Sequence, residues 1–174
     1  MAVIEAIATT YLEADAASVT FSSLGSYEHL QLRCNMKSDR SASSVDGFRL
    51  TFNSDTASNY SHHYMWGSTS SASAGRFTGT RLNLQNMLAD DAGETPAANF
   101  STGIIDILDY RNANKNTTVM ALLGTAGTTL WSTVSFESGL WDDTSAVTSI
   151  LLDQVNGPNF MRGSEFTLYG ITSS

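Results

Sequence analysis

The last twelve residues of the chain carry the alternation of a β-strand, and the same alternation recurs along most of the sequence. Within residues 163–174, Phe166 and Leu168 fall on one face of an extended segment, and Thr167 and Tyr169 fall on the other. A disordered tail would not carry this pattern, so we expect the segment to be held in a sheet. A chain built from such segments folds as a β protein.

Other short segments with strand-like patterns are separated by turn residues such as Gly, Asn, Asp and Ser. The segment 100–110 is apolar enough for both of its faces to be covered. Residues 38–46 are expected to form a loop, 68–75 a connection rich in Ser, Ala and Gly, and 85–98 a helical turn or loop. The segments with strand-like patterns are 3–12, 18–24, 29–36, 47–53, 60–67, 77–84, 100–110, 118–123, 129–136, 146–155 and the terminal segment.

This pattern lacks a convincing amphipathic helix of twelve residues, which indicates an all-β fold. The prediction is an antiparallel β-sandwich, jelly-roll-like, with about nine or ten strands. The 174 residues suffice for a single globular domain with its own core. Within it, residues 27–174 are expected to form the sandwich, and residues 1–26 an added N-terminal strand or an arm that docks on a neighbouring subunit.

The charge balance bears on the partners of the chain. The formal net charge is −8, and the nine Lys and Arg residues are scattered, so no basic cluster is present to neutralise phosphates. Nucleic acid is therefore not an expected partner, whereas a basic protein patch is compatible with this charge. No apolar run of twenty residues is present and no signal peptide is recognisable, so we expect no membrane span. The single cysteine, Cys34, is expected to be a buried small hydrophobic residue.

Candidate metal ligands are few. His62 and His63 are adjacent, so a strand directs them to opposite faces and they are not expected to share an ion. The oxygens of Asn53, Asp55 and Asn59 suit a calcium loop, but the commoner role of such residues is to hydrogen-bond the backbone of a turn. We therefore predict no metal site and no cofactor.

Motifs for catalysis are also missing from the sequence. A glucanase-like sandwich would carry Glu-x-Asp-x-Glu on one strand, and a serine hydrolase would carry a Gly-x-Ser-x-Gly elbow; neither run occurs. No glycine-rich phosphate loop precedes a helix. The prediction is a protein without enzymatic activity and without catalytic residues.

The tryptophans are the best candidates for contact with a glycan or a protein partner. Trp66, Trp131 and Trp141 could stack on sugars, although tryptophan in a sheet protein more often lies in the core or in an interface. Trp141 stands beside Asp142 and Asp143 at a loop, so of the three it is the one that we expect to be partly exposed. The candidate contact residues are Trp141, Asp142, Asp143 and Trp66.

Several segments in this order and spacing resemble a pattern found in small structural proteins of tailed bacteriophages. The resemblance covers most of the chain from Tyr27 onward. It rests on Tyr27-Glu-His-Leu-Gln-Leu with Arg33, Leu50-Thr-Phe-Asn53 with Ser58-Asn-Tyr60, Ile105-Asp-Ile-Leu-Asp-Tyr110 with Asn112, Asn114 and Lys115, Gly139-Leu-Trp141, Thr144-Ser-Ala-Val-Thr-Ser-Ile150, and Asn159-Phe160 leading to Gly163-Ser-Glu-Phe-Thr-Leu-Tyr-Gly-Ile171.

This resemblance implies a non-enzymatic β-sandwich of the virion. It marks five positions as defining the fold, not as a binding site: Asn53, Asp109, Tyr110, Trp141 and Tyr169. Virion proteins of this kind are head-decoration proteins, also called cement proteins, or tail-fibre proteins.

Two locations in the virion follow from the resemblance. A tail fibre adds a long trimeric shaft to its tip, and this chain has neither heptads nor a Gly-x-y run. We therefore expect a capsid decoration protein on the outer surface of the head, a homotrimer that binds the major capsid protein and stabilises the shell. The alternative is a receptor- or glycan-binding module of the tail.

Overall fold

The computed structural model describes residues 3–89, 99–126 and 132–172, and these residues form an antiparallel β-sandwich without a helix, as the sequence predicts. No helix in these ranges is therefore long and apolar enough to cross a membrane. The described ranges contain twelve strands, two or three more than expected. They are β1 (Val3–Tyr11), β2 (Ser18–Phe21), β3 (His29–Ser38), β4 (Val45–Phe52), β5 (Tyr60–Ser68), β6 (Ala72–Gly79), β7 (Leu82–Ala89), β8 (Ser101–Leu108), β9 (Thr117–Ala126), β10 (Ser132–Trp141), β11 (Ile150–Gln154) and β12 (Glu165–Thr172).

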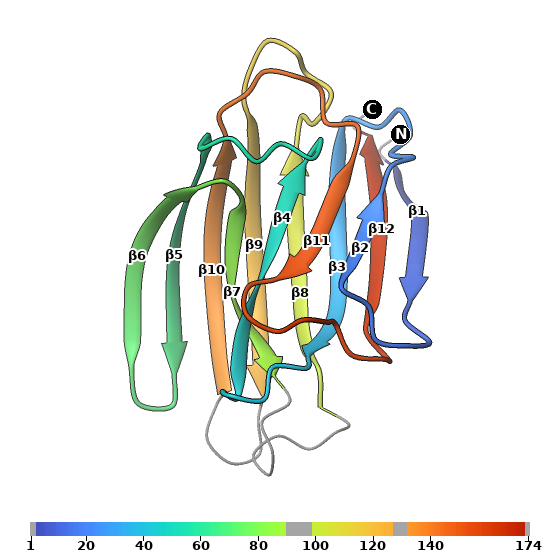
Figure 1. Ribbon diagram of the computed structural model, residues 1–174. Helices are drawn as coiled ribbons and strands as arrows, with labels where there is room; N and C mark the ends of the chain where they lie inside the picture. The colour runs from blue at the N-terminus through green and yellow to red at the C-terminus, as the bar shows by residue number, and fades with distance from the viewer. Residues whose placement is uncertain (1–2, 90–98, 127–131, 173–174) are drawn as a thin grey trace.

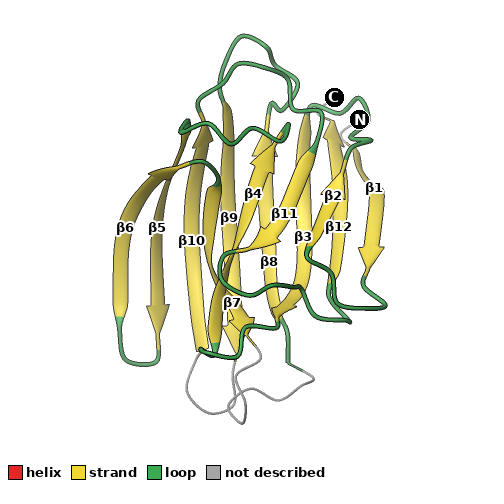
Figure 2. Ribbon diagram, in the orientation of Figure 1, coloured by secondary structure: helices red, strands yellow, loops and turns green. Residues whose placement is uncertain are grey.

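The strands form two layers, which lie one in front of the other in Figures 1 and 2. The large sheet has eight strands in the order β1-β12-β3-β8-β9-β10-β5-β6, and the small sheet has four in the order β2-β11-β4-β7. One short parallel pairing, Lys37 with Leu88 and Ser38 with Ala89, joins β3 to β7 and so links the two sheets. The jelly roll, a finer statement than the sandwich, stays a prediction.

The core lies between the sheets, where every second residue of each covered strand points inward. On β3 the inward residues are Leu30, Leu32, Cys34 and Met36, all buried, as the alternation predicts. Burial raises the pKa of the Cys34 thiol above its ordinary range, so this cysteine behaves as a small hydrophobic residue. The small sheet contributes the inward residues Val19, Phe21, Phe48, Leu50, Phe52, Leu82, Leu84, Ile150 and Leu152.

Residues 3–26 are part of the sandwich. β1 pairs along its length with β12, so that Val3 lies opposite Thr172, and β2 pairs with β11. Both strands thus pair with the C-terminal half of the same chain. Phe166 and Leu168 of β12 are fully buried, which confirms that the terminal segment is held in the sheet.

The largest difference from the predicted strand boundaries lies between residues 68 and 89. The expected strand 77–84 is interrupted at Thr80 and Arg81, where the chain passes from β6 in the large sheet to β7 in the small sheet. The expected connection 68–75 already contains the start of β6, and the expected loop 85–98 begins with the end of β7. Residues 90–98 lie outside the described residues. Gly79 directly precedes the crossing, but a single glycine within an alternating segment does not by itself predict a change of sheet.

Tyr110 and Asn53, which the resemblance marks as defining the fold, attach loops to the sheets by hydrogen bonds. The hydroxyl of Tyr110 donates to the carbonyl oxygens of Leu24 (3.2 Å) and Gly25 (3.0 Å) and accepts from the backbone NH of Tyr27 (3.3 Å). The side chain of Asn53, a residue with positive φ, bonds the backbone of the loop before β11. Both positions are structural in this protein.

Candidate functional site

Trp141 lies in the core, so the prediction that it is partly exposed is wrong. It is 1% exposed and packs against Phe52 and Tyr60, with ring centroids 5.6 and 6.3 Å away. Its indole NH donates to Oδ2 of Asp55 at 2.7 Å. The backbone NH of Ala57, together with the side chains of Asn59 and Trp141, keeps the pKa of Asp55 below its ordinary value. A ring buried in this way cannot stack on a sugar.

The other candidate contact residues do not gather at one site. Asp142 accepts from Asn116 Nδ2 at 2.6 Å and so joins the loop after β10 to the loop between β8 and β9. Asp143 accepts from the backbone NH of Ser145 at 2.6 Å, within its own loop. Trp66 is half-buried on β5, on the face of the large sheet that is turned toward the small sheet. Trp131 lies outside the described residues.

The turn with Asn53, Asp55 and Asn59 has the commoner of the two roles considered for it. Asp55 bonds the NH of Ala57 at 2.8 Å and Nδ2 of Asn59 at 2.8 Å, so its oxygens are used within the loop. Among residues 3–89, 99–126 and 132–172, no group of three or more His, Cys, Asp or Glu could hold a metal ion.

The two histidines point to opposite faces of β5, as the alternation predicts. His62 is 2% exposed and faces inward, while His63 is exposed on the outer face of the large sheet. The His62 ring stacks on Phe77 at 5.2 Å, and its Nε2 has no hydrogen-bond partner within the described part of the chain. Burial, and secondarily the charge of His63, lowers the pKa of His62 to about 4.

This shift makes the stability of the protein depend on pH. Between pH 6.5 and pH 4 the His62 side chain is protonated in the unfolded chain but mostly neutral in the folded protein. The free energy of unfolding therefore falls as the pH is lowered. We expect a loss of about 2 kcal/mol from this residue over that window, measured by urea unfolding at a series of pH values. In H62F the slope between pH 6.5 and 5 should become flatter than in the wild type. An unchanged slope in H62F would show that His62 is not its source.

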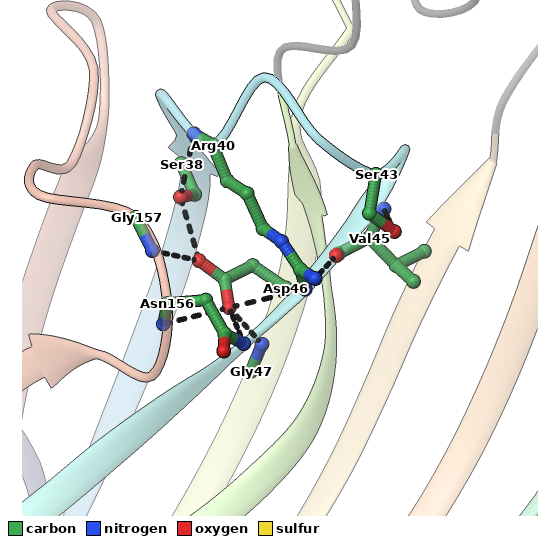
Figure 3. A network of polar contacts seen from close by, with 8 residues as sticks. All are labelled: Ser38, Arg40, Ser43, Val45, Asp46, Gly47, Asn156 and Gly157. Carbon is green, nitrogen blue, oxygen red and sulfur yellow. Dashed lines mark hydrogen bonds and ion pairs between the residues drawn. The ribbon is translucent and has the colours of Figure 1, made fainter.

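Figure 3 shows a buried polar network around Asp46, at the end of the sandwich where the two sheets meet. Oδ1 of Asp46 accepts from the backbone NH of Gly47 and from the backbone NH and Nδ2 of Asn156, at 2.8 to 3.1 Å. Oδ2 accepts from Ser38 Oγ and from the backbone NH of Gly157, both at 2.8 Å. One carboxylate thus ties together the end of β3, the start of β4 and the loop after β11. Both carboxylate oxygens of Asp46 accept hydrogen bonds from other groups of the protein, so this network is structural.

In the described part of the chain, the outer face of the large sheet, the side turned away from the small sheet, carries a group of exposed apolar side chains. Ile104, Leu122, Phe136 and Met65 stand directly opposite one another on β8, β9, β10 and β5, and Ala74 of β6 completes the row. We call these five residues the apolar row. Its four large side chains are between 40% and 57% exposed. With strands about 4.8 Å apart, the row extends about 19 Å across the sheet.

Further apolar and polar groups surround the apolar row. Val134 lies on one side of it, between the glycines of the neighbouring strands, and Met120 lies on the other. Arg33 stands opposite Ile104 beyond one end of the row, while Arg76 is exposed on the outer face of β6, near its other end. Two open hollows of about 590 and 540 Å³ lie beside the row and share Met65, Ala74 and Phe136. An apolar centre with a polar rim is the arrangement of a protein–protein interface.

The sequence contains a signal for this face. The segment 100–110 is apolar on both sides and was therefore expected to be covered on both sides. In the single chain, Ile105 and Ile107 are buried under the small sheet, but Ile104 and Leu108 on the other side remain exposed. The two-sided apolar pattern of β8 could therefore have pointed to the outer face as a contact surface.

Comparison of the chain with models of known protein families, with curated proteins and with solved structures finds no match.

Proposed function

We propose that the protein is a non-enzymatic virion structural protein, a decoration protein that binds the outer surface of a bacteriophage head through the outer face of its large sheet. The observation that carries this proposal is the apolar row, with four large apolar side chains exposed in line across neighbouring strands. Exposed apolar surface of this extent is typical of an interaction site. The sequence resemblance to phage virion proteins supplies the class of partner.

The partner in this proposal is the major capsid protein, and three copies of the chain stand around a local three-fold position of the shell. Burying the apolar row against the shell removes its side chains from water, at roughly 25 cal/mol per Å² of apolar surface. Because the chain binds the assembled shell and not its free subunits, binding stabilises the shell by mass action. The polar ends of the row, with Arg33 and Arg76, orient the docked molecule.

Co-sedimentation of the labelled protein with undecorated shells tests this proposal, with host cells as the parallel sample. The proposal expects saturable binding in a fixed ratio to capsid subunits, and no binding to cells. Binding to cells but not to shells would overturn it and favour the alternative, a receptor-binding module of the tail. Analytical ultracentrifugation of the free protein tests the trimer separately.

Two phenylalanines offer a matched pair of variants for the same assay. Phe136 in the apolar row and Phe77, on the other face of the large sheet, are each 47% exposed. F136S should weaken shell binding by about 30-fold or more, the effect of losing an aromatic hot spot, whereas F77S should bind as the wild type does. Equal binding of F136S and wild type would show that the outer face is not the docking surface.

A further inference from the structure

A polar groove lies on the side of the molecule opposite to the apolar row. It is bounded by the loop between β4 and β5 and by the crossing from β6 to β7, and its volume is about 470 Å³. This volume falls within the range of small-molecule sites, about 300 to 1,000 Å³. Its lining includes Arg49, Thr56, Phe77, Thr80, Arg81 and Asn83.

Two arginines give this groove a local positive charge. Arg49 donates from Nε and Nη2 to the two carboxylate oxygens of Asp153, both at 2.9 Å, and Arg81 donates from Nη1 to the same carboxylate at 2.6 Å. Within the described ranges, Asp153 is the only carboxylate that pairs with either arginine. Two cations therefore share one anion, in a protein whose net charge is −8.

The arginine pair is held in place and still reaches solvent. Asp153 fixes the two guanidinium groups, so little side-chain freedom is left to lose when an anion binds. The side chains of Arg49 and Arg81 are 26% and 28% exposed, so each has N–H groups available to a ligand in the groove. A carboxylate on that ligand could accept two parallel hydrogen bonds from one guanidinium group.

An aromatic ring and neutral polar groups complete the groove. Phe77 is half-exposed, and its ring is supported from behind by the stacked rings of His62 and Tyr64, at 5.2 and 5.7 Å. Thr56, Thr80 and Asn83 contribute hydroxyl and amide groups that can both donate and accept. A fixed apolar ring face beside many neutral polar groups suits a sugar, whose ring has an apolar face and a hydroxylated edge.

We propose that this groove binds an acidic saccharide: the sugar ring lies on Phe77 and its carboxylate lies against Arg49 and Arg81. The site is separate from the apolar row, because Arg49 and Asp153 lie on the solvent-facing side of the small sheet. A molecule docked through the outer face of the large sheet would therefore keep this groove open to solvent.

Isothermal titration calorimetry with two acidic sugars, each paired with a neutral counterpart, tests this site. The probes are tetragalacturonic acid with its fully methyl-esterified form, and sialyllactose with lactose. We expect at least one acid to bind about tenfold or more tightly than its neutral counterpart, because each charge-assisted pair contributes on the order of a tenfold change. Binding of neither acid, or equal binding of an acid and its neutral counterpart, would overturn the proposal.

Two matched variants distinguish binding in this groove from a general effect of the protein's charge on an acidic ligand. R81Q should weaken binding of the acid by about tenfold or more, while R76Q, which removes an exposed cation from the outer face of β6, should leave it unchanged. Equal losses in R81Q and R76Q would overturn the proposal.

The phenylalanine pair distinguishes this site from the docking face. F77S should lose saccharide binding and keep shell binding, and F136S should do the reverse. F136S tests the docking face and F77S tests the groove, so the two proposals can fail independently of each other. Saccharide binding by F77S equal to that of the wild type would contradict the position of the sugar on Phe77.

Discussion

Replacing Asp46 with alanine is expected to lower the free energy of unfolding by about 3–5 kcal/mol, the cost of breaking a buried charged network. The Asp46 side chain is fully buried and accepts five hydrogen bonds. In D46A these donors would remain in the folded protein without their acceptor, and buried unsatisfied donors are costly. Urea unfolding followed by far-UV circular dichroism measures the loss.

Two further variants show whether this loss comes from the network. D46N keeps the shape of the side chain but turns an NH₂ group toward donors, so we expect a loss smaller than that of D46A but clear. E165A removes an exposed carboxylate of β12 and should change the free energy of unfolding by less than about 0.5 kcal/mol. A D46A protein within about 1 kcal/mol of the wild type would contradict the structural role of the network.

Replacing Trp141 with alanine is expected to cost about 3–5 kcal/mol, the usual range for deleting a buried aromatic side chain. The cavity would open between Phe52 and Tyr60, and Asp55 would lose the donor that ties its loop to β10. Because the variant removes a fluorophore, its urea unfolding is again followed by far-UV circular dichroism.

Trp66 provides the control, since it is the same residue type in a half-buried place on the neighbouring strand β5. W66A should lose clearly less stability than W141A, because less of its ring is removed from water in the wild type. Equal destabilisation of W141A and W66A would contradict the deeper burial of Trp141.

The sequence predicted the sandwich and most strands because alternation is a local signal. Residues 29–36 show four inward apolar side chains in strict alternation, and β3 places all four in the core. The crossing at Thr80 and Arg81 was missed because its one turn residue, Gly79, stands alone in an otherwise strand-like segment, and a lone glycine does not specify a change of sheet. Which strands pair also depends on contacts between distant segments, such as β5 with β10, that no local pattern encodes.

The candidate contact residues were harder to predict, because exposure depends on tertiary packing. Trp141 is followed by two acidic residues, a neighbourhood typical of a loop, yet it occupies the last position of β10 and turns inward. Asp46 was assigned to a polar loop, whereas the fold uses it as a buried acceptor. The apolar row is visible only after the strands are in register, since its members come from distant segments.

Methionine oxidation tests the docking face most directly, because Met65 and Met120 on the outer face of the large sheet are 57% and 42% exposed. The measurement is the rate of oxidation by hydrogen peroxide of each methionine, by mass spectrometry, in the free protein and in the protein bound to shells. We predict that binding slows oxidation of Met65 and Met120 by about tenfold or more, since oxidation follows exposure. Met161, in the loop between β11 and β12, should keep its rate. Oxidation of Met65 and Met120 at the free rate in the shell-bound protein would contradict docking through this face.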